Sequence, residues 1–366
     1  SEYYTVVLFG GVLGSVYSLL QFVAAPLWGA LSDRIGRRPV LLVTVAGVTF
    51  SYVLWFFAGS FSLLVAARVL GGFMAGNLSV ATAAVADVTD AQNRSKGMGL
   101  LGAAFGVGFL VGPSLGGGLS LLRLDELLPS LPGINPFSGA ALVACGLSAI
   151  NLLRVALRFH ETRRGDGPKQ ARSVNPLRLF RPTGVPGVSL TNVVYFLYTT
   201  AFAGMEFTLT FLARDRFGYS SLKNALMFVY VGFLVALVQG GVVRRLTPRY
   251  GEKRVTLAGI VLIGPGLVSI GAATTEVLLY GGLLLLAVGS ALATPTLTAL
   301  ASLYAPEHRQ GELLGVFRSL GSLARAIAPL LAASLYWRFG SALPYYFGAL
   351  MLVVPLALAT RLPSRN

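Results

Sequence analysis

Four ionisable side chains stand inside long apolar stretches of this 366-residue chain, and they are the residues best placed to do chemistry. They are Arg68, Glu206, Arg318 and Arg325. A charge in hydrocarbon is costly unless it faces a polar cavity or a partner, so such residues mark ion and proton pathways. A carboxylate can take up a proton, and a guanidinium can hold an anion. We therefore expect Arg68, Glu206 and Arg325 to act in coupling or substrate binding.

Glu206 and Arg325 fall at overlapping depths. Counting about 1.5 Å per helical residue, Glu206 lies about 9 Å and Arg325 about 15 Å from the outer ends of their predicted helices. If both face one cavity, they could neutralise each other while it is empty. Arg325 would then be offered to an anionic substrate when Glu206 takes a proton. The alternative is that Glu206 lies at the outer interface and meets Arg214 or Arg216.

The other two arginines have open alternatives. Arg68 stands seven residues inside its predicted helix, where it either faces a polar cavity or extends along the helix to the interface. Arg318 and Arg325 are seven residues apart and share one helix face. Arg318 is close enough to the cytoplasmic end to be an interfacial anchor. Arg325, about 20 Å from the start of its helix, is expected to line the cavity.

The elements that hold these residues are predicted to be membrane-spanning helices. The chain is 55% apolar and 12% charged. The segments 5–31 and 39–67 carry no charged residue, and each is longer than the roughly 20 residues needed to cross a bilayer. Without period-2 alternation, such runs satisfy their backbone groups as helices and not as barrel strands. We predict an all-α membrane protein with eleven helices at 5–31, 39–57, 62–85, 97–119, 137–157, 188–212, 222–243, 255–273, 277–303, 313–336 and 342–362.

The distribution of the basic residues, which give the chain a net charge of +15, agrees with a membrane-spanning topology. Basic residues gather in alternate loops, notably at 34–38, 158–186 and 244–254, which is the pattern of cytoplasmic loops. The exception is the presumed external turn at 214–223, which is also basic. We expect a multi-pass protein of the plasma membrane or an endomembrane, whose partner is the lipid bilayer and not nucleic acid.

An internal repeat explains the odd number of helices. Three pairs of residues share one offset of 215 or 216 positions: Gly36 with Gly251, Arg94 with Arg309, and Pro113 with Pro329. The same offset places a partner for the helix at 188–212 before the start of this chain. We predict a six-plus-six architecture with the first helix missing, in which 1–162 is the N-terminal bundle (helices 2–6), 163–186 a cytoplasmic linker, and 187–366 the C-terminal bundle (helices 7–12).

The segment 29–39 reads GALSDRIGRRP, which we expect to be a tight loop between two spans. Its pattern G-x-L-S-D-R-x-G-R-R resembles the signature loop of the major facilitator superfamily. The resemblance implies that Gly29 permits close packing, that Asp33 faces the start of the helix at 313–336, and that a charged cluster with Asp87 latches the cytoplasmic face. The alternative is a set of solvated loop charges. The residues concerned are Gly29, Asp33, Arg34, Gly36, Arg37, Arg38 and Asp87, and the second copy, at 244–254, lacks the aspartate.

Two further motifs point to one branch of that superfamily. The segment 108–117 resembles the antiporter motif G-x-x-x-G-P-x-x-G-G, carried here by Gly108, Gly112, Pro113, Gly116 and Gly117. Glycines four apart give a smooth packing face and the proline bends the helix, so a plain packing stripe is the alternative. The run RVLGGFMAG from Arg68 is similar to the family's R-x-x-x-G motif linked to proton transfer, and 159–163 resembles the ending that the antiporters show after their sixth helix.

The predicted function rests on these features together. Segments 194–209 and 318–326 resemble tetracycline-transporter-like members of the superfamily, which implies organic anions as cargo. We predict a secondary active transporter of small organic ions, monomeric and proton-coupled or exchanging. The alternative is a transporter-like membrane sensor that binds a ligand without moving it. With a single cysteine, no P-loop and no nucleophile beside a base, we predict no enzyme, no metal site and no cofactor.

Overall fold

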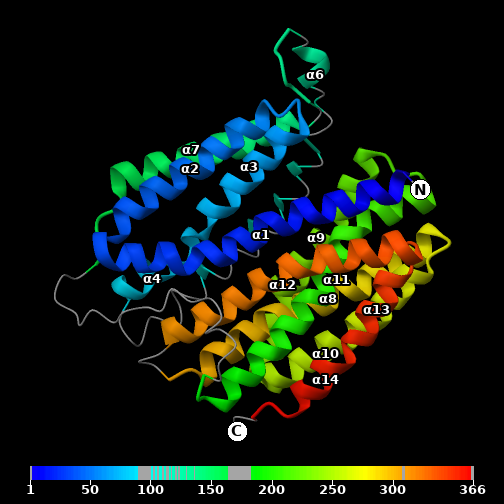
Figure 1. Ribbon diagram of the computed structural model, residues 1–366. Coiled ribbons are helices and arrows are strands. Elements are labelled where there is room, and N and C mark those ends of the chain that lie inside the picture. Colours follow the sequence, from blue (N-terminus) through cyan, green and yellow to red (C-terminus); the bar gives the residue numbers. More distant parts are fainter. Residues whose placement is uncertain are drawn as a thin grey trace. The chain divides into compact units, whose positions relative to one another are not determined.

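The computed structural model describes residues 2–89, 137–163, 183–306 and 310–363. Between 100 and 135 it describes positions 100–101, 104, 107–108, 111–112, 115–116, 118–119, 122, 124–128 and 130–135. Helices dominate these residues, and no strand occurs among them (Figure 1). The all-α fold class is therefore confirmed.

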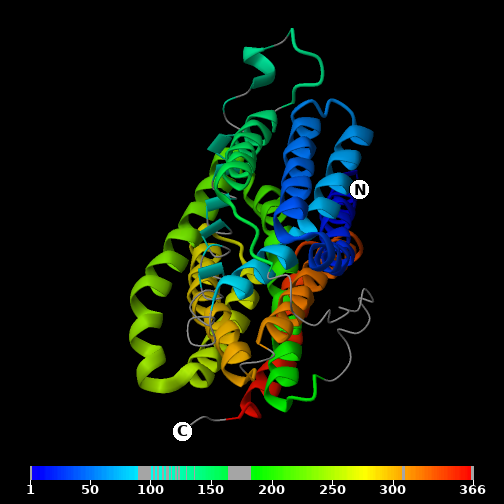
Figure 2. The same ribbon diagram turned by 90° about the vertical axis from the view of Figure 1, so that its left-hand side faces the viewer.

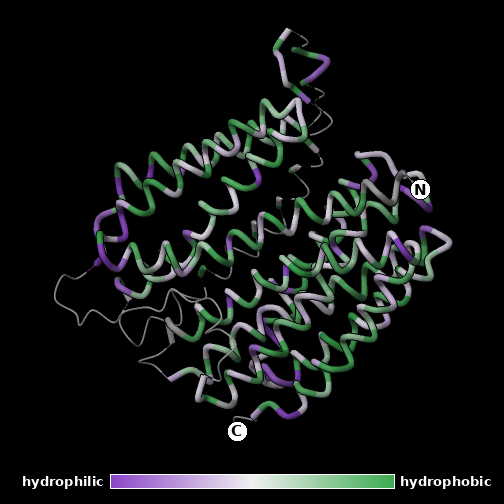
Figure 3. The backbone as a smooth tube through the Cα atoms, viewed as in Figure 1, coloured by the Kyte–Doolittle hydropathy of each residue, from purple (hydrophilic) through white to green (hydrophobic). Residues whose placement is uncertain are grey.

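Nine stretches of the described chain are long and apolar enough to cross a membrane. One of them, Ser221–Ala272, has 52 residues and contains two of the predicted helices, so the nine account for ten of the eleven. The remaining one, 97–119, lies largely outside the described residues, although the positions described there are helical. Green, apolar residues run along these helices in Figure 3, as expected for surfaces that meet lipid.

The chain divides into two compact units. One comprises residues 16–101 and 115–181, and the other 1–15, 102–114 and 182–366. The predicted division into bundles at 1–162 and 187–366 remains a prediction.

The first of these units, the N-terminal unit, contains most of α1 (Glu2–Ile35) and the helices that follow it. They are α2 (Arg37–Phe56), α3 (Phe61–Met74), the 3₁₀ turn η1 (Ala75–Asn77), α4 (Leu78–Val88), the short α6 (Leu124–Leu127) and α7 (Ser138–Arg158). Helix α2 packs along both α3 and α7. The predicted helix 62–85 is thus interrupted at η1.

The second, C-terminal unit is one helical bundle in both Figure 1 and Figure 2, from the green part of the chain to the red. Its helices are α8 (Pro186–Phe217), α9 (Ser221–Leu237), the π-helix η4 (Val238–Val243), α10 (Arg244–Ala272), α11 (Glu276–Tyr304), α12 (Gln310–Phe339), α13 (Leu343–Met351) and α14 (Val353–Thr360). Helices α10 and α11 approach each other closely at two glycine pairs. A Cβ on Gly259 would lie 2.6 Å from the carbonyl oxygen of Gly289, and a Cβ on Gly266 would lie 2.9 Å from the carbonyl oxygen of Gly282. Small residues allow this approach where no water drives helices together.

The two loops predicted at 29–39 and 244–254 are much shorter than expected. Helix α1 continues to Ile35 and α2 begins at Arg37, so the chain turns at Gly36 alone, with φ 107° and ψ 159°. The helix from Arg244 is likewise broken only at Gly251, with φ 79° and ψ 156°. Both conformations are accessible essentially to glycine only. The match in backbone geometry supports the predicted pairing of these two residues in a repeat.

Candidate functional site

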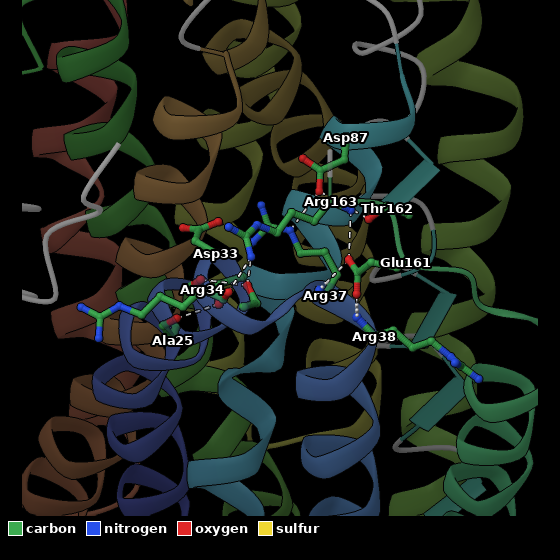
Figure 4. Close-up of polar contacts among 12 residues, drawn as sticks. Ala25, Asp33, Arg34, Arg37, Arg38, Asp87, Glu161, Thr162 and Arg163 are labelled. Atoms are coloured by element: carbon green, nitrogen blue, oxygen red, sulfur yellow. Dashed lines mark hydrogen bonds and ion pairs between the residues drawn. The ribbon is translucent and has the colours of Figure 1, made fainter. Parts of the chain in front are cut away.

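Arg37 is the centre of a charged cluster at one end of the N-terminal unit. Its guanidinium donates hydrogen bonds to the Ser32 hydroxyl at 2.6 Å, to the Asp33 carboxylate, and from Nε to Asp87 at 2.9 Å (Figure 4). Only 6% of Arg37 is exposed. One buried cation therefore joins the end of α1, the start of α2 and the end of α4.

Glu161, which was not among the predicted site residues, closes this cluster from the segment after α7. Its carboxylate accepts hydrogen bonds from the backbone N–H groups of Arg37 at 2.8 Å, Arg38 at 3.1 Å and Arg163 at 2.9 Å. Burial works to raise the pKa of Glu161, but these backbone donors outweigh it and hold the pKa below its usual value. The carboxylate is thus a negative group at the positive end of α2.

The close fit of Glu161 also explains the residue at the turn. A Cβ on Gly36 would overlap the carboxylate of Glu161. Glycine is therefore required there both for its positive φ and for the space that the carboxylate occupies.

The other predicted residues of this region take separate positions. Arg34 is exposed and its side chain points away from Arg37, while its carbonyl accepts a hydrogen bond from Arg163 (Figure 4). Arg38 donates to the carbonyl of Ala156 at 2.6 Å, near the end of α7. Gly29 is buried within α1. The structure thus brings Asp33, Arg37 and Asp87 together but leaves Arg34 outside.

The second copy of the turn keeps one of these contacts and lacks the rest. Lys253, which follows Arg38 by 215 residues, donates to the carbonyl of Leu362 at 2.6 Å, just after α14. The residues aligned with Asp33 and Arg37 are Pro248 and Glu252 (33 + 215 and 37 + 215). Four arginines of this segment are exposed and form no ion pair within the described residues: Arg244, Arg245, Arg249 and Arg254.

Arg68, on α3, lies between two aromatic rings. Its guanidinium carbon is 4.7 Å from the centre of the Tyr17 ring and 5.0 Å from that of Trp55. The side chain is part-buried, and no carboxylate within the described residues forms an ion pair with it. A cavity of about 40 Å³ adjoins it. Arg68 therefore packs among the helices of its own unit.

Glu206 and Arg325 lie on α8 and α12, two helices of the C-terminal unit that pack along each other. Both side chains are part-buried, and no ion pair joins them in the part of the chain that the structure describes. Arg216, the alternative partner for Glu206, instead donates to the carbonyls of Gly271 at 2.8 Å and Ala273 at 3.0 Å. It therefore stabilises the C-terminal end of α10.

The remaining predicted residues contribute less to a site. Arg318 is part-buried on α12. Gly108, Gly112 and Gly116 of the antiporter motif have no described atom within 4 Å of a Cβ position, and Pro113 and Gly117 lie outside the described residues.

Comparison with known proteins is consistent across sequence and structure. The chain matches the sequence profile of the Major Facilitator Superfamily over residues 4–329, with a second match over 241–365. It is 39% identical to major facilitator superfamily domain-containing protein 10 of Bos taurus, covering 99% of this chain and 81% of that protein. It is 33% identical to the class C tetracycline resistance protein of Escherichia coli, with 96% and 86% covered. The crystal structure of the human organic anion transporter MFSD10 (TETRAN) superposes with a TM-score of 0.75 at 34% identity, covering 98% of this chain and 85% of that one.

Proposed function

Because this chain belongs to the Major Facilitator Superfamily of membrane transporters, we propose that it carries small organic anions by alternating access and couples their movement to protons or to a second anion. The anion preference is supported by the similarity to human MFSD10, which is described as an organic anion transporter. It is also supported by the cationic side chains inside the spans, Arg68 and Arg325.

The observation that carries the proposal is the placement of Glu206 and Arg325, one carboxyl group and one guanidinium, on α8 and α12, two membrane helices that pack along each other. An ionised Glu206 neutralises Arg325 and competes with any anion for it. When a proton binds a Glu206 carboxylate oxygen, the negative charge is lost and Arg325 becomes available to a substrate carboxylate. Release of the anion and of the proton restores the pair, so the two movements are linked.

The cluster around Arg37 would serve the conformational change. It holds α1, α2, α4 and the segment after α7 together at one end of the unit. Movement of helix bundles as rigid bodies is the usual basis of alternating access. We expect Asp33→Asn to reduce transport more than substrate binding, and equal loss of both, or loss of neither, contradicts a latch.

The test uses the full-length protein in proteoliposomes, a panel of radiolabelled small organic carboxylates, and uptake with and without a pH gradient. Glu206→Gln should leave exchange intact but remove its response to the gradient. Arg325→Ala should abolish saturable anion binding. Arg338→Ala, an exposed arginine on the same helix, is the matched control and should behave as the unmodified protein.

Two results would decide against the proposal. Unchanged anion affinity in Arg325→Ala removes the assignment of the anion site. Binding of a carboxylate without counterflow of the labelled compound would indicate a membrane sensor that does not transport.

A further inference from the structure

Arg68 is a cation whose hydrogen-bonding needs are not met by the residues described. A guanidinium has five N–H donors and no acceptor. Within the described residues, Arg68 forms neither an ion pair nor a hydrogen bond, and its contacts are the ring faces of Tyr17 and Trp55. Ring faces attract a cation but do not replace oxygen acceptors at its N–H groups. A part-buried charge left in this state is costly unless something else fills the site.

The cavity beside Arg68 has the size and lining for a small anion. It measures about 40 Å³ and is lined by Tyr17, Val48, Ser51, Tyr52, Trp55, Ala67, Arg68 and Gly71. A single water-sized particle needs roughly 10–15 Å³ by this measure. The cavity thus has room for a halide ion or a carboxylate group, but not for a whole organic molecule, whose pockets measure roughly 300 Å³ or more.

Besides the guanidinium, two hydroxyl groups of this lining can donate hydrogen bonds to an anion. Tyr17, whose ring centre is 4.7 Å from the Arg68 guanidinium carbon, and Tyr52 line the same cavity as Arg68, and neither hydroxyl forms a hydrogen bond to another described residue. The Ser51 hydroxyl is already used, since it donates to the Val48 carbonyl at 2.7 Å. No acidic side chain lines the cavity. Its net charge is therefore positive.

Gly71 keeps the space open. A Cβ at this position would lie 2.9 Å from the Ser51 hydroxyl oxygen and 3.4 Å from the Tyr17 ring. Any larger residue would therefore crowd two of the groups that line the cavity.

We infer that the cavity between Tyr17, Tyr52, Trp55 and Arg68 binds one monovalent anionic group, held by the guanidinium and the two phenol hydroxyls. The group is either a free halide such as chloride or the carboxylate end of an organic substrate. The carboxylate source rests on the proposed function, whereas the halide source does not.

Trp55 supplies a direct probe, because iodide bound beside Arg68 would quench its fluorescence. The other two tryptophans of this chain are replaced by phenylalanine (Trp28→Phe and Trp337→Phe). The full-length protein is then placed in lipid nanodiscs and titrated with sodium iodide. We expect saturable quenching. Arg68→Gln should raise the half-saturating concentration more than tenfold, and Tyr17→Phe or Tyr52→Phe should each raise it up to about tenfold.

Controls and competition complete the experiment. Arg154→Gln, an exposed arginine of the same unit, should leave the titration unchanged. If Arg68→Gln does not fold, the half-saturating iodide concentrations of Tyr17→Phe and Tyr52→Phe decide whether the anion binds in this cavity. Competition by chloride but not by benzoate supports the halide, and competition by both supports a substrate carboxylate. Quenching that rises linearly and is identical in the tyrosine and Arg68 variants overturns the inference, whether or not the protein transports.

Discussion

The turns at Gly36 and Gly251 are two versions of one structure with different charges. Each glycine has positive φ and a ψ close to 160°. Each turn is followed by a basic residue, Arg38 or Lys253, that donates to a carbonyl at the end of a later helix, α7 or α14. The backbone and this contact are thus common to both halves.

The difference lies in the acidic residues. The first turn is surrounded by Asp33, Asp87 and Glu161, all bonded to the start of α2. The second has Pro248 in place of Asp33, and no described carboxylate accepts a hydrogen bond from its backbone. The backbone turn and the basic contact are therefore present in both halves, whereas, among the described residues, an ion cluster around a buried arginine is present only in the first. This difference leads to four predictions.

The largest effect is expected at the buried cation. Arg37→Met should lower the free energy of unfolding of the N-terminal unit by about 3 kcal/mol, because removing one partner leaves Asp33 and Asp87 without their counter-charge. Glu252→Met, at the aligned position of the second copy, should change it by less than about 0.5 kcal/mol. Thermal unfolding in detergent measures both. Equal effects would show that the first turn has no special electrostatic role.

The two glycines provide the next comparison. Gly251→Ala should lower the free energy of unfolding by about 1–2 kcal/mol, because alanine is strained at positive φ, while no atom of the described residues lies within 4 Å of the added Cβ. Gly36→Ala should lower the free energy of unfolding by more, since its added Cβ would also overlap the Glu161 carboxylate. The excess should shrink when Gly36→Ala is combined with Glu161→Ala. An equal cost at both positions would mean that Glu161 can move aside freely.

Glu161 should make the stability of the first turn depend on pH. Hydrogen bonds from backbone N–H groups hold the pKa of Glu161 in the folded protein below the usual value of a glutamate side chain. Its contribution is therefore complete above that value and is lost as the pH falls through the lower, folded pKa. We expect Glu161→Gln to be less stable at pH 7 by about 0.5–1 kcal/mol, with the difference vanishing in strong acid. Melting temperatures between pH 3 and pH 7 test this, and a constant difference would contradict it.

The smallest effects are expected where the halves agree. Arg38→Met and Lys253→Met should each lower the free energy of unfolding by about 0.3–1 kcal/mol, which is the usual stabilisation by a cation at the C-terminal end of a helix. Arg34→Met, whose side chain points away from the cluster, is the control with no expected effect. A large difference between the first two variants would show that the shared contact is not equivalent in the two halves.

Much of the fold follows from local sequence. Apolar runs longer than a bilayer must form helices, so the spans were predictable except for interruptions such as η1 and η4. The offset of 215 also paired Gly36 with Gly251 before their backbone angles were known. The predicted extent of the loop at 29–39 is wrong, because charged residues such as Asp33 and Arg34 belong to the last turn of α1, which continues to Ile35.

The sequence by itself determined that this protein is a bundle of membrane helices with ionisable residues inside the spans, since both properties depend on residue type and spacing along one segment. Only the tertiary structure decided which groups those residues meet. Glu161 reaches the start of α2 across 124 positions through backbone N–H groups, which leave no mark in the sequence. Arg68 likewise lies between Tyr17 and Trp55 beside a small cavity, because three helices pack there, and residue types alone do not specify how helices pack.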